Sequence, residues 1–184
     1  MLQERHHLSA ARPLDVGRLS VRLAPDRDRF SFRIDPALAD AAGRALGLDL
    51  SGPIGTVSGR DERCALRLGP DEWFLLMPSE TGGEGEKRLA RALPDAAWSL
   101  VDVSHREVGI EVSGPAAALA LRSFVAFDLD AMPANSGCRT IFDRAQIILF
   151  RETPDRFRIE VWQSFASHVW ALLDAASREI ALDI

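Results

Sequence analysis

The chain has 184 residues, 47% of them hydrophobic and 27% charged, with a formal net charge of −5. This composition is typical of a single globular domain, and the negative charge argues against broad binding to nucleic acids or anionic membranes. The sequence contains no run of about 18 apolar residues, so no membrane-spanning helix is predicted. The N-terminus lacks the apolar core of a signal peptide. We therefore expect a cytoplasmic protein.

Residues 1–18 are expected to form an N-terminal arm, and residues 19–184 a single domain. Alternating or short apolar segments within that domain predict strands. In chain order these segments are 19–23, 30–34, 64–68, 73–77, 98–103, 107–113, 140–151 and 157–162. The polar segments 24–29 and 152–155 predict hairpin connections. The apolar run 73–77 predicts a strand that is buried on both faces.

Helices are indicated by start signals, stop signals and apolar spacing. They are predicted at 36–46, 86–93, 115–124 and 164–178. Asp35 and Pro36 form an N-cap and first-turn pair, and Gly47 ends the first helix. The Gly-rich segment 51–63 lacks the GK[ST] ending of a phosphate loop, so we interpret it as a surface connection. The segment 81–85 is expected to be an exposed loop.

The best-defined unit runs from Glu107 to Phe124. Val108, Ile110 and Val112 alternate with other residues, which predicts a half-buried strand. Ser113-Gly114-Pro115 then ends the strand, because Gly relieves backbone restriction and Pro favours a first helical position.

A strand-strand-helix order occurs at 64–93, 98–124 and 140–178. Helices that follow antiparallel hairpins pack on one face of a sheet, so we expect an α+β fold. Ser164 is predicted to cap the last helix. Its apolar stripe comprises Phe165, Val169, Leu172, Leu173 and Ala176, with Phe165 as a core anchor.

Two polar clusters invite a catalytic interpretation. Ser104 and His105 provide a nucleophile and a base, but adjacent residues on a strand point to opposite faces. We instead expect Asp102, Ser104 and Arg106 to share a face and form a salt bridge. Asp71-Glu72 diverge for the same reason and are interpreted as a solvated turn. No catalytic, cofactor-binding or metal-binding residue is therefore assigned.

Cys64 and Cys138 lack metal-ligand spacing, and we expect two reduced, buried thiols. His6 and His7 are a weak metal signal on the predicted arm. Trp73 and Trp98 most simply fill the core, whereas Trp162 and Trp170 are also candidate interface anchors.

Four segments together resemble the gamma subunit of heterotetrameric sarcosine oxidase. They are GPDEWFLLMP (69–78), VDVSHREVGIEVSGP (101–115), CRTIFDRAQIILFRE (138–152) and DRFRIEVWQSFASHVWALL (155–173). The resemblance implies a fold similar to the folate-binding domain of the glycine-cleavage aminomethyltransferase, with two interlocked halves.

The resemblance also implies a cytoplasmic complex that oxidises sarcosine to glycine, reduces oxygen to hydrogen peroxide and passes the one-carbon unit to tetrahydrofolate. FAD, NAD, FMN, tetrahydrofolate and zinc would then lie on other subunits, and this chain would bind a large alpha subunit and, through it, beta and delta subunits. In the region comparable to the folate-binding strand of the aminomethyltransferase, only Asp71 could match a residue of the family motif. The bulky Trp73 in the same region argues against folate binding by this chain. A free-standing folate-dependent protein and an assembly module for another amine-oxidising flavoenzyme remain alternatives.

Overall fold

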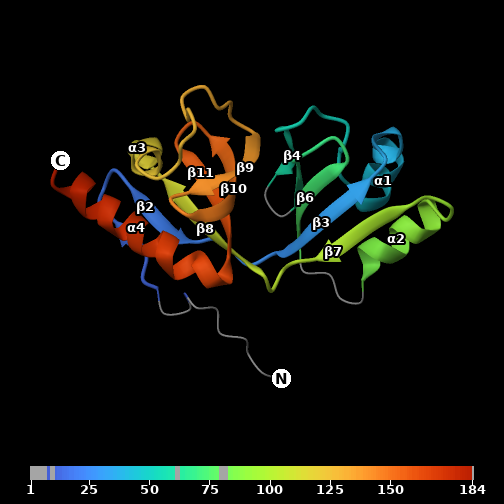
Figure 1. Cartoon of the computed structure of the whole chain (residues 1–184), viewed down its shortest axis with the longest axis horizontal. Helices are drawn as coiled ribbons and strands as arrows, with labels where there is room; N and C mark the ends of the chain where they lie inside the picture. Colours follow the sequence, from blue (N-terminus) through green and yellow to red (C-terminus); the bar gives the residue numbers. More distant parts are fainter. Residues whose placement is uncertain (1–7, 9–10, 61–62, 79–82, 184) are drawn as a thin grey trace, which may run out of the picture. The chain divides into compact units, whose positions relative to one another are not determined.

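A computed structural model describes residue 8 and residues 11–60, 63–78 and 83–183. The chain divides into two compact units (Figure 1). The discontinuous unit comprises the chain up to Pro25 together with the chain from His105 onward. The inserted unit is Asp26–Ser104. Each unit has its own antiparallel sheet and its own hydrophobic core, as expected for an α+β fold.

The discontinuous unit is built on a six-stranded sheet with the order β1-β2-β8-β11-β10-β9. Its strands are β1 (Leu14–Asp15), β2 (Ser20–Leu23), β8 (Glu107–Ser113), β9 (Ser136–Phe142), β10 (Ala145–Thr153) and β11 (Arg156–Trp162). Its helices, α3 (Ala117–Arg122) and α4 (Gln163–Ala181), contribute buried residues to the same core as the strands.

The inserted unit is built on a five-stranded sheet with the order β4-β5-β6-β3-β7. Its strands are β3 (Asp28–Ile34), β4 (Val57–Arg60), β5 (Arg63–Arg67), β6 (Glu72–Met77) and β7 (Trp98–Asp102). Its helical elements are the 3-10 turn η1 (Pro36–Leu38), α1 (Ala39–Leu46) and α2 (Glu84–Ala92).

Strand β8 has the predicted bounds, but the prediction of a half-buried strand is wrong, because both of its faces are buried. Glu111 is only 2% exposed and pairs with Arg22 at 2.8 Å and with Arg156 at 3.3 Å. These cations allow a carboxylate to be buried on the face expected to meet solvent. A Cβ at Gly109 would lie 2.7 Å from Nη2 of the buried Arg158 and 2.9 Å from the Ala24 Cβ, so any larger residue would force these neighbours to shift.

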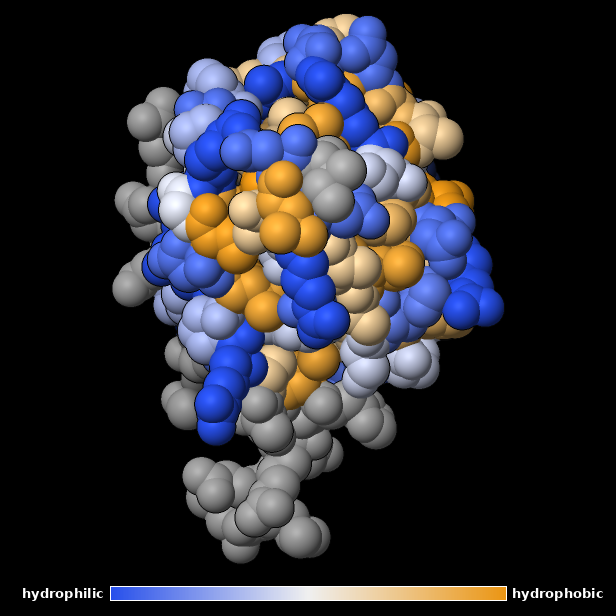
Figure 2. All heavy atoms as spheres, turned by 90° about the vertical axis from the view of Figure 1, so that its left-hand side faces the viewer, coloured by the Kyte–Doolittle hydropathy of each residue, from blue (hydrophilic) through white to orange (hydrophobic). Residues whose placement is uncertain are grey.

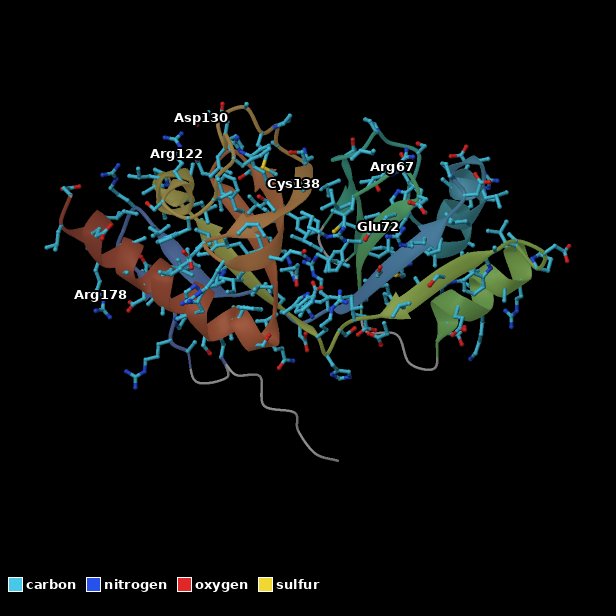
Figure 3. The ribbon with its side chains drawn as sticks, viewed as in Figure 1. Arg67, Glu72, Arg122, Asp130, Cys138 and Arg178 are labelled. Atoms are coloured by element: carbon cyan, nitrogen blue, oxygen red, sulfur yellow. The ribbon has the colours of Figure 1, made fainter. Side chains whose placement is uncertain are left out.

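The turn after β8 confirms the prediction of a Gly-Pro stop. Gly114 has φ +112, and a Cβ there would lie 2.4 Å from the Arg18 carbonyl oxygen. Helix α3 begins only at Ala117, with Ala116 as its N-cap, so the prediction of Pro115 as the first helical residue is wrong and the helix is shorter than expected. Arg122 at its end pairs with Asp130 in the following loop (Figure 3).

The predicted strand 140–151 is wrong as a single element. It is divided by a turn at Asp143-Arg144 into β9 and β10, which pair with each other. Asp143 has φ +52, a value that Asp tolerates better than most residues. The predicted hairpin between β10 and β11 is confirmed.

Helix α4 follows β11 directly, so the prediction of Ser164 as its cap is wrong: Trp162 is the N-cap, without a side-chain hydrogen bond. The α4 residues in the core are Ala166, Val169, Leu173, Ala176, Ser177 and Ile180. The expected stripe is therefore correct at Val169, Leu173 and Ala176, with Leu172 partly buried against the core, but it is wrong at its first position.

In the inserted unit, the start and end signals of the first helix are confirmed. The Asp35 carboxylate accepts a hydrogen bond from the Ala37 N–H at 2.9 Å, and Gly47 has φ +69. Strand β6 is buried on both faces, as predicted. Part of the predicted surface connection 51–63 is a strand, β4, which pairs with β5.

The predicted hairpin of residues 19–23 with 30–34 is wrong, because the two strands belong to different sheets. β2 pairs with β1 and β8, whereas β3 pairs with β6 and β7. β7 and β8 are divided in the same way, so 98–124 is not a strand-strand-helix unit. The other two units are confirmed as β5-β6-α2 and β10-β11-α4.

Candidate subunit interface at the start of the last helix

Trp162 is presented at the junction of β11 and α4. It is 41% exposed, and the Arg106 guanidinium lies 5.5 Å from its ring centroid. Nη2 of Arg106 also lies 2.7 Å from a carboxylate oxygen of the buried Glu107, which pairs with Trp162 across the sheet. The exposed indole is therefore oriented by a cation that is itself held by a buried carboxylate.

Gln163 fixes the segment before β8 against the start of α4. Its N–H donates to the Arg106 carbonyl at 2.9 Å, and its side-chain amide donates to the His105 carbonyl at 2.7 Å. Both bonds hold the backbone that carries Arg106. The position of Trp162 is therefore set by the fold and not by a mobile loop.

Phe165 lies one helical turn after Trp162 and is 36% exposed. The prediction that it anchors the core is wrong, because the core-facing stripe of α4 passes through Ala166 instead. With 3.6 residues per turn, a shift of one position rotates a side chain by about 100°. Phe165 is therefore a second exposed aromatic residue at the start of α4.

His168 continues this flank of α4 and contacts the β9–β10 turn. Its Nε2 lies 2.8 Å from Asp143 Oδ2, and Arg144 Nε lies 3.3 Å from the same ring nitrogen. The hydrogen bond with His168 is the main reason why the pKa of Asp143 is lowered. We call Arg106, Trp162, Phe165 and His168 the α4 entry surface.

Trp170 lies elsewhere on α4. It is partly buried against the core and lines a groove of about 470 Å³ together with Leu8, Ala11 and Leu14. Eight residues separate it from Trp162, about 12 Å along a helix axis. The two predicted anchors therefore do not form one cluster, and Trp162 is the more exposed.

The polar pairs considered for catalysis have structural contacts. The Ser104 hydroxyl accepts a hydrogen bond from the Arg29 N–H at 2.9 Å, and the Ser104 N–H donates to the Asp102 carboxylate at 2.8 Å. No strand covers residues 103–106, so the expected shared face of Asp102, Ser104 and Arg106 is wrong.

Asp71 and Glu72 are both held by one cation. Arg33 lies 3.2 Å from the Asp71 carboxylate and 3.1 Å from that of Glu72. Next to them, Trp73 is 1% exposed and packs in the core with the Arg67 guanidinium 5.0 Å from its ring centroid. In the region that is comparable to the aminomethyltransferase folate strand, the indole of Trp73 is therefore part of the hydrophobic core.

Among the described residues, the cysteines and histidines form no metal site. Cys64 is buried, and Cys138 on β9 is partly buried, which raises the pKa of its thiol (Figure 3). His6 and His7 lie outside the described residues. Within the part of the chain that the structure describes, no group of three or more His, Cys, Asp or Glu could hold a metal ion. No described helix is long and apolar enough to cross a membrane.

Figure 2 shows the side of the molecule on which α4 ends, where apolar residues gather in a central group with polar and charged residues around them. At the other end of α4, the exposed aromatic side chains are of the kind that is enriched in protein interfaces, as Arg is. The α4 entry surface, with two aromatic side chains and a stacked Arg, has this character.

Comparison with known proteins places the chain in a family. Residues 31–179 match the "sarcosine oxidase, gamma subunit family". A sarcosine oxidase subunit gamma from Corynebacterium sp. (strain P-1) is 33% identical over 162 residues, which cover 86% of this chain and 75% of the relative. A subunit gamma from Arthrobacter sp. is 34% identical over 139 residues, covering 73% of this chain and 68% of the relative.

Among solved structures, a chain of the heterotetrameric sarcosine oxidase from Corynebacterium sp. U-96 matches with a TM-score of 0.84 and 27% identity. The match covers 95% of this chain and 93% of that chain. The glycine cleavage system aminomethyltransferase T from Bartonella henselae shares the fold, with a TM-score of 0.61 and 16% identity over 83% of this chain and 44% of that one. The chain therefore belongs to the sarcosine oxidase gamma subunit family.

Proposed function

We propose that this chain is the gamma subunit of a heterotetrameric sarcosine oxidase and that it has no catalytic role of its own. The observation that carries the proposal is the fold match to a chain of that complex over nearly the full length of both chains. The family match over residues 31–179 supports it.

The complex would oxidatively demethylate sarcosine to glycine in the cytoplasm, reduce oxygen to hydrogen peroxide and transfer the one-carbon unit to tetrahydrofolate. FAD, FMN, NAD, tetrahydrofolate and zinc would be held by the alpha, beta and delta subunits. Two contacts support a non-catalytic role: Ser104 is bound to the Arg29 backbone, and Arg33 holds Asp71 and Glu72. These side chains stabilise the inserted unit.

The α4 entry surface is our candidate for the contact with the large subunit. Trp and Arg side chains dominate the binding energy of many interfaces when a partner excludes water from them. Trp162 is exposed yet held by Arg106, so little side-chain entropy is lost when a partner covers it.

Co-expression of the chain with the large flavin-bearing subunit, followed by size-exclusion chromatography, tests the proposal. We expect the two chains to co-elute in a peak with flavin absorbance, and separate elution would contradict the partner assignment. Titration of the isolated chain with tetrahydrofolate distinguishes this proposal from the alternative of a free-standing folate protein. Only the alternative predicts that the isolated chain binds tetrahydrofolate.

A pair of variants tests the surface itself. The double variant Trp162→Ala/Phe165→Ala, competing with the wild-type chain for the large subunit, should be incorporated about tenfold less. Ile54→Ala, which truncates a side chain that is 60% exposed in the inserted unit, is the matched control and should compete equally. Equal incorporation of the double variant would exclude this surface as the contact.

A further inference from the structure

Strand β7 forms an edge of the five-stranded sheet, with β3 as its neighbour on one side (Figure 1). The Val103 N–H donates to the Arg29 carbonyl at 2.8 Å, which fixes which residues of this segment face β3. The backbone groups of Ser99 and Val101 point toward β3, because hydrogen-bonded positions alternate in an antiparallel pair. Those of Trp98, Leu100 and Asp102 therefore point away from the sheet.

The two faces of this edge differ. Val101 is 51% exposed on one face. On the other face, Leu100 packs close to Gly85 at the start of α2. A strand added beside β7 would therefore place alternate side chains near Val101 and near α2.

A cavity of about 240 Å³ lies on the α2 side of this edge. Phe30, Met77 and Leu100 provide its apolar lining. Four carboxylate residues also line it: Asp28, Glu84, Glu86 and Asp102. Lys87 pairs with Glu84 at 2.8 Å and offsets the charge of that carboxylate, so the acidic character of the lining comes mainly from Glu86 and Asp102.

An apolar cavity with an acidic rim suits a long basic side chain, because Lys and Arg combine an apolar stem with a cationic head. An open strand edge supplies main-chain donors and acceptors, and a neighbouring pocket that takes one side chain supplies specificity. Both features occur at β7, and the charge of the rim is complementary to that of a basic side chain.

We propose that β7 is a second docking site, at which another subunit of the complex adds an extended strand and inserts a Lys or Arg side chain between β7 and α2. The neighbouring residues of that strand would be apolar where they face Val101. The inference rests on the proposed function, because it takes the occupant from the same assembly. It is independent of the α4 entry surface.

Hydrogen–deuterium exchange on the isolated chain and on the co-expressed complex tests the proposal. The amides of Trp98, Leu100 and Asp102 should exchange at least tenfold more slowly in the complex. Those of Ser99 and Val101 are bonded to β3 and should be protected in both states, which provides an internal control. Equal exchange of the three outward amides in the two states would overturn the proposal.

A charge reversal tests the acidic rim. Glu86→Lys, competing with the wild-type chain for its partners, should be incorporated at least fivefold less, with a smaller deficit at high salt. Glu179→Lys makes the same change at an exposed position of α4 and should compete equally. Equal incorporation of Glu86→Lys would contradict the basic occupant. Absence of any complex would contradict the proposed function and this inference together, whereas a complex with unprotected β7 amides would overturn this inference alone.

Discussion

The packing phase of α4 gives a sharp stability prediction. Leu173 is fully buried, whereas Phe165 is 36% exposed at the start of the same helix. Truncation of a fully buried Leu costs about 2–5 kcal/mol through lost burial and the cavity that remains. We expect Leu173→Ala to lower the free energy of unfolding by about 3 kcal/mol and Phe165→Ala by about 1 kcal/mol.

Urea unfolding of the isolated chain, followed by far-ultraviolet circular dichroism, measures both effects. With a denaturant dependence of about 2 kcal/mol per molar urea, Leu173→Ala should lower the midpoint by about 1.5 M. Phe165→Ala should lower it by about 0.5 M. If Phe165→Ala shifted the midpoint as much as Leu173→Ala, the assigned phase of the helix would be refuted.

Three further predictions concern the discontinuous unit. Gly114→Ala should lower the free energy of unfolding in urea by about 1–3 kcal/mol, because Gly114 has a positive φ and lies close to the Arg18 carbonyl. Gly69→Ala is the control and should be near neutral, because a Cβ there meets only the Glu72 side chain, at 3.6 Å and 4.0 Å. Burial raises the pKa of Glu111, but Arg22 and Arg156 outweigh it, so the net pKa lies below the ordinary value of 4.5. Its stabilisation is therefore fully present above pH 4.5 and is lost as the pH falls through the lowered pKa. Glu111→Gln should flatten the decline of the urea midpoint below that pH, and parallel declines would contradict the role of its charge. Because burial raises the pKa of the Cys138 thiol, iodoacetamide should modify this thiol slowly at pH 8 in the folded chain and rapidly in urea. Thiol titration of the unfolded chain should count two free thiols. Modification at equal rates with and without urea would be inconsistent with burial of Cys138.

Local signals predicted most elements of the fold. The cap at Asp35, the stop at Gly47 and the Gly114 turn each depend on neighbouring residues, and all three are confirmed. The predicted bounds of the strand 107–113 are also correct, because they too depend on neighbouring residues. Short-range backbone chemistry is visible in a single sequence.

Local patterns could not predict which strands pair with each other in which sheet. The polar segment between β2 and β3 has the composition of a hairpin turn, yet the chain passes there from one sheet to the other. Burial of Glu111 depends on Arg22 and Arg156, which are 89 and 45 positions away. Such long-range partners decide which face of a strand is buried.

The candidate interface was predicted in part. Trp162 was identified from its residue type, but Arg106 and His168 acquire their roles only through the fold. The regular spacing of Ala166, Val169 and Leu173 was available in the sequence, and the size of Phe165 favoured the wrong phase.

Purification of the tagged chain from its native host, under conditions that preserve complexes, tests the central claim most directly. The purified material should show flavin absorbance and produce hydrogen peroxide when sarcosine is added. The same chain, expressed alone, should be colourless and produce none. Sarcosine-dependent peroxide from the chain alone would contradict the proposed non-catalytic role, and purification from the host without flavin or sarcosine oxidation would contradict the proposed place of the chain in the complex.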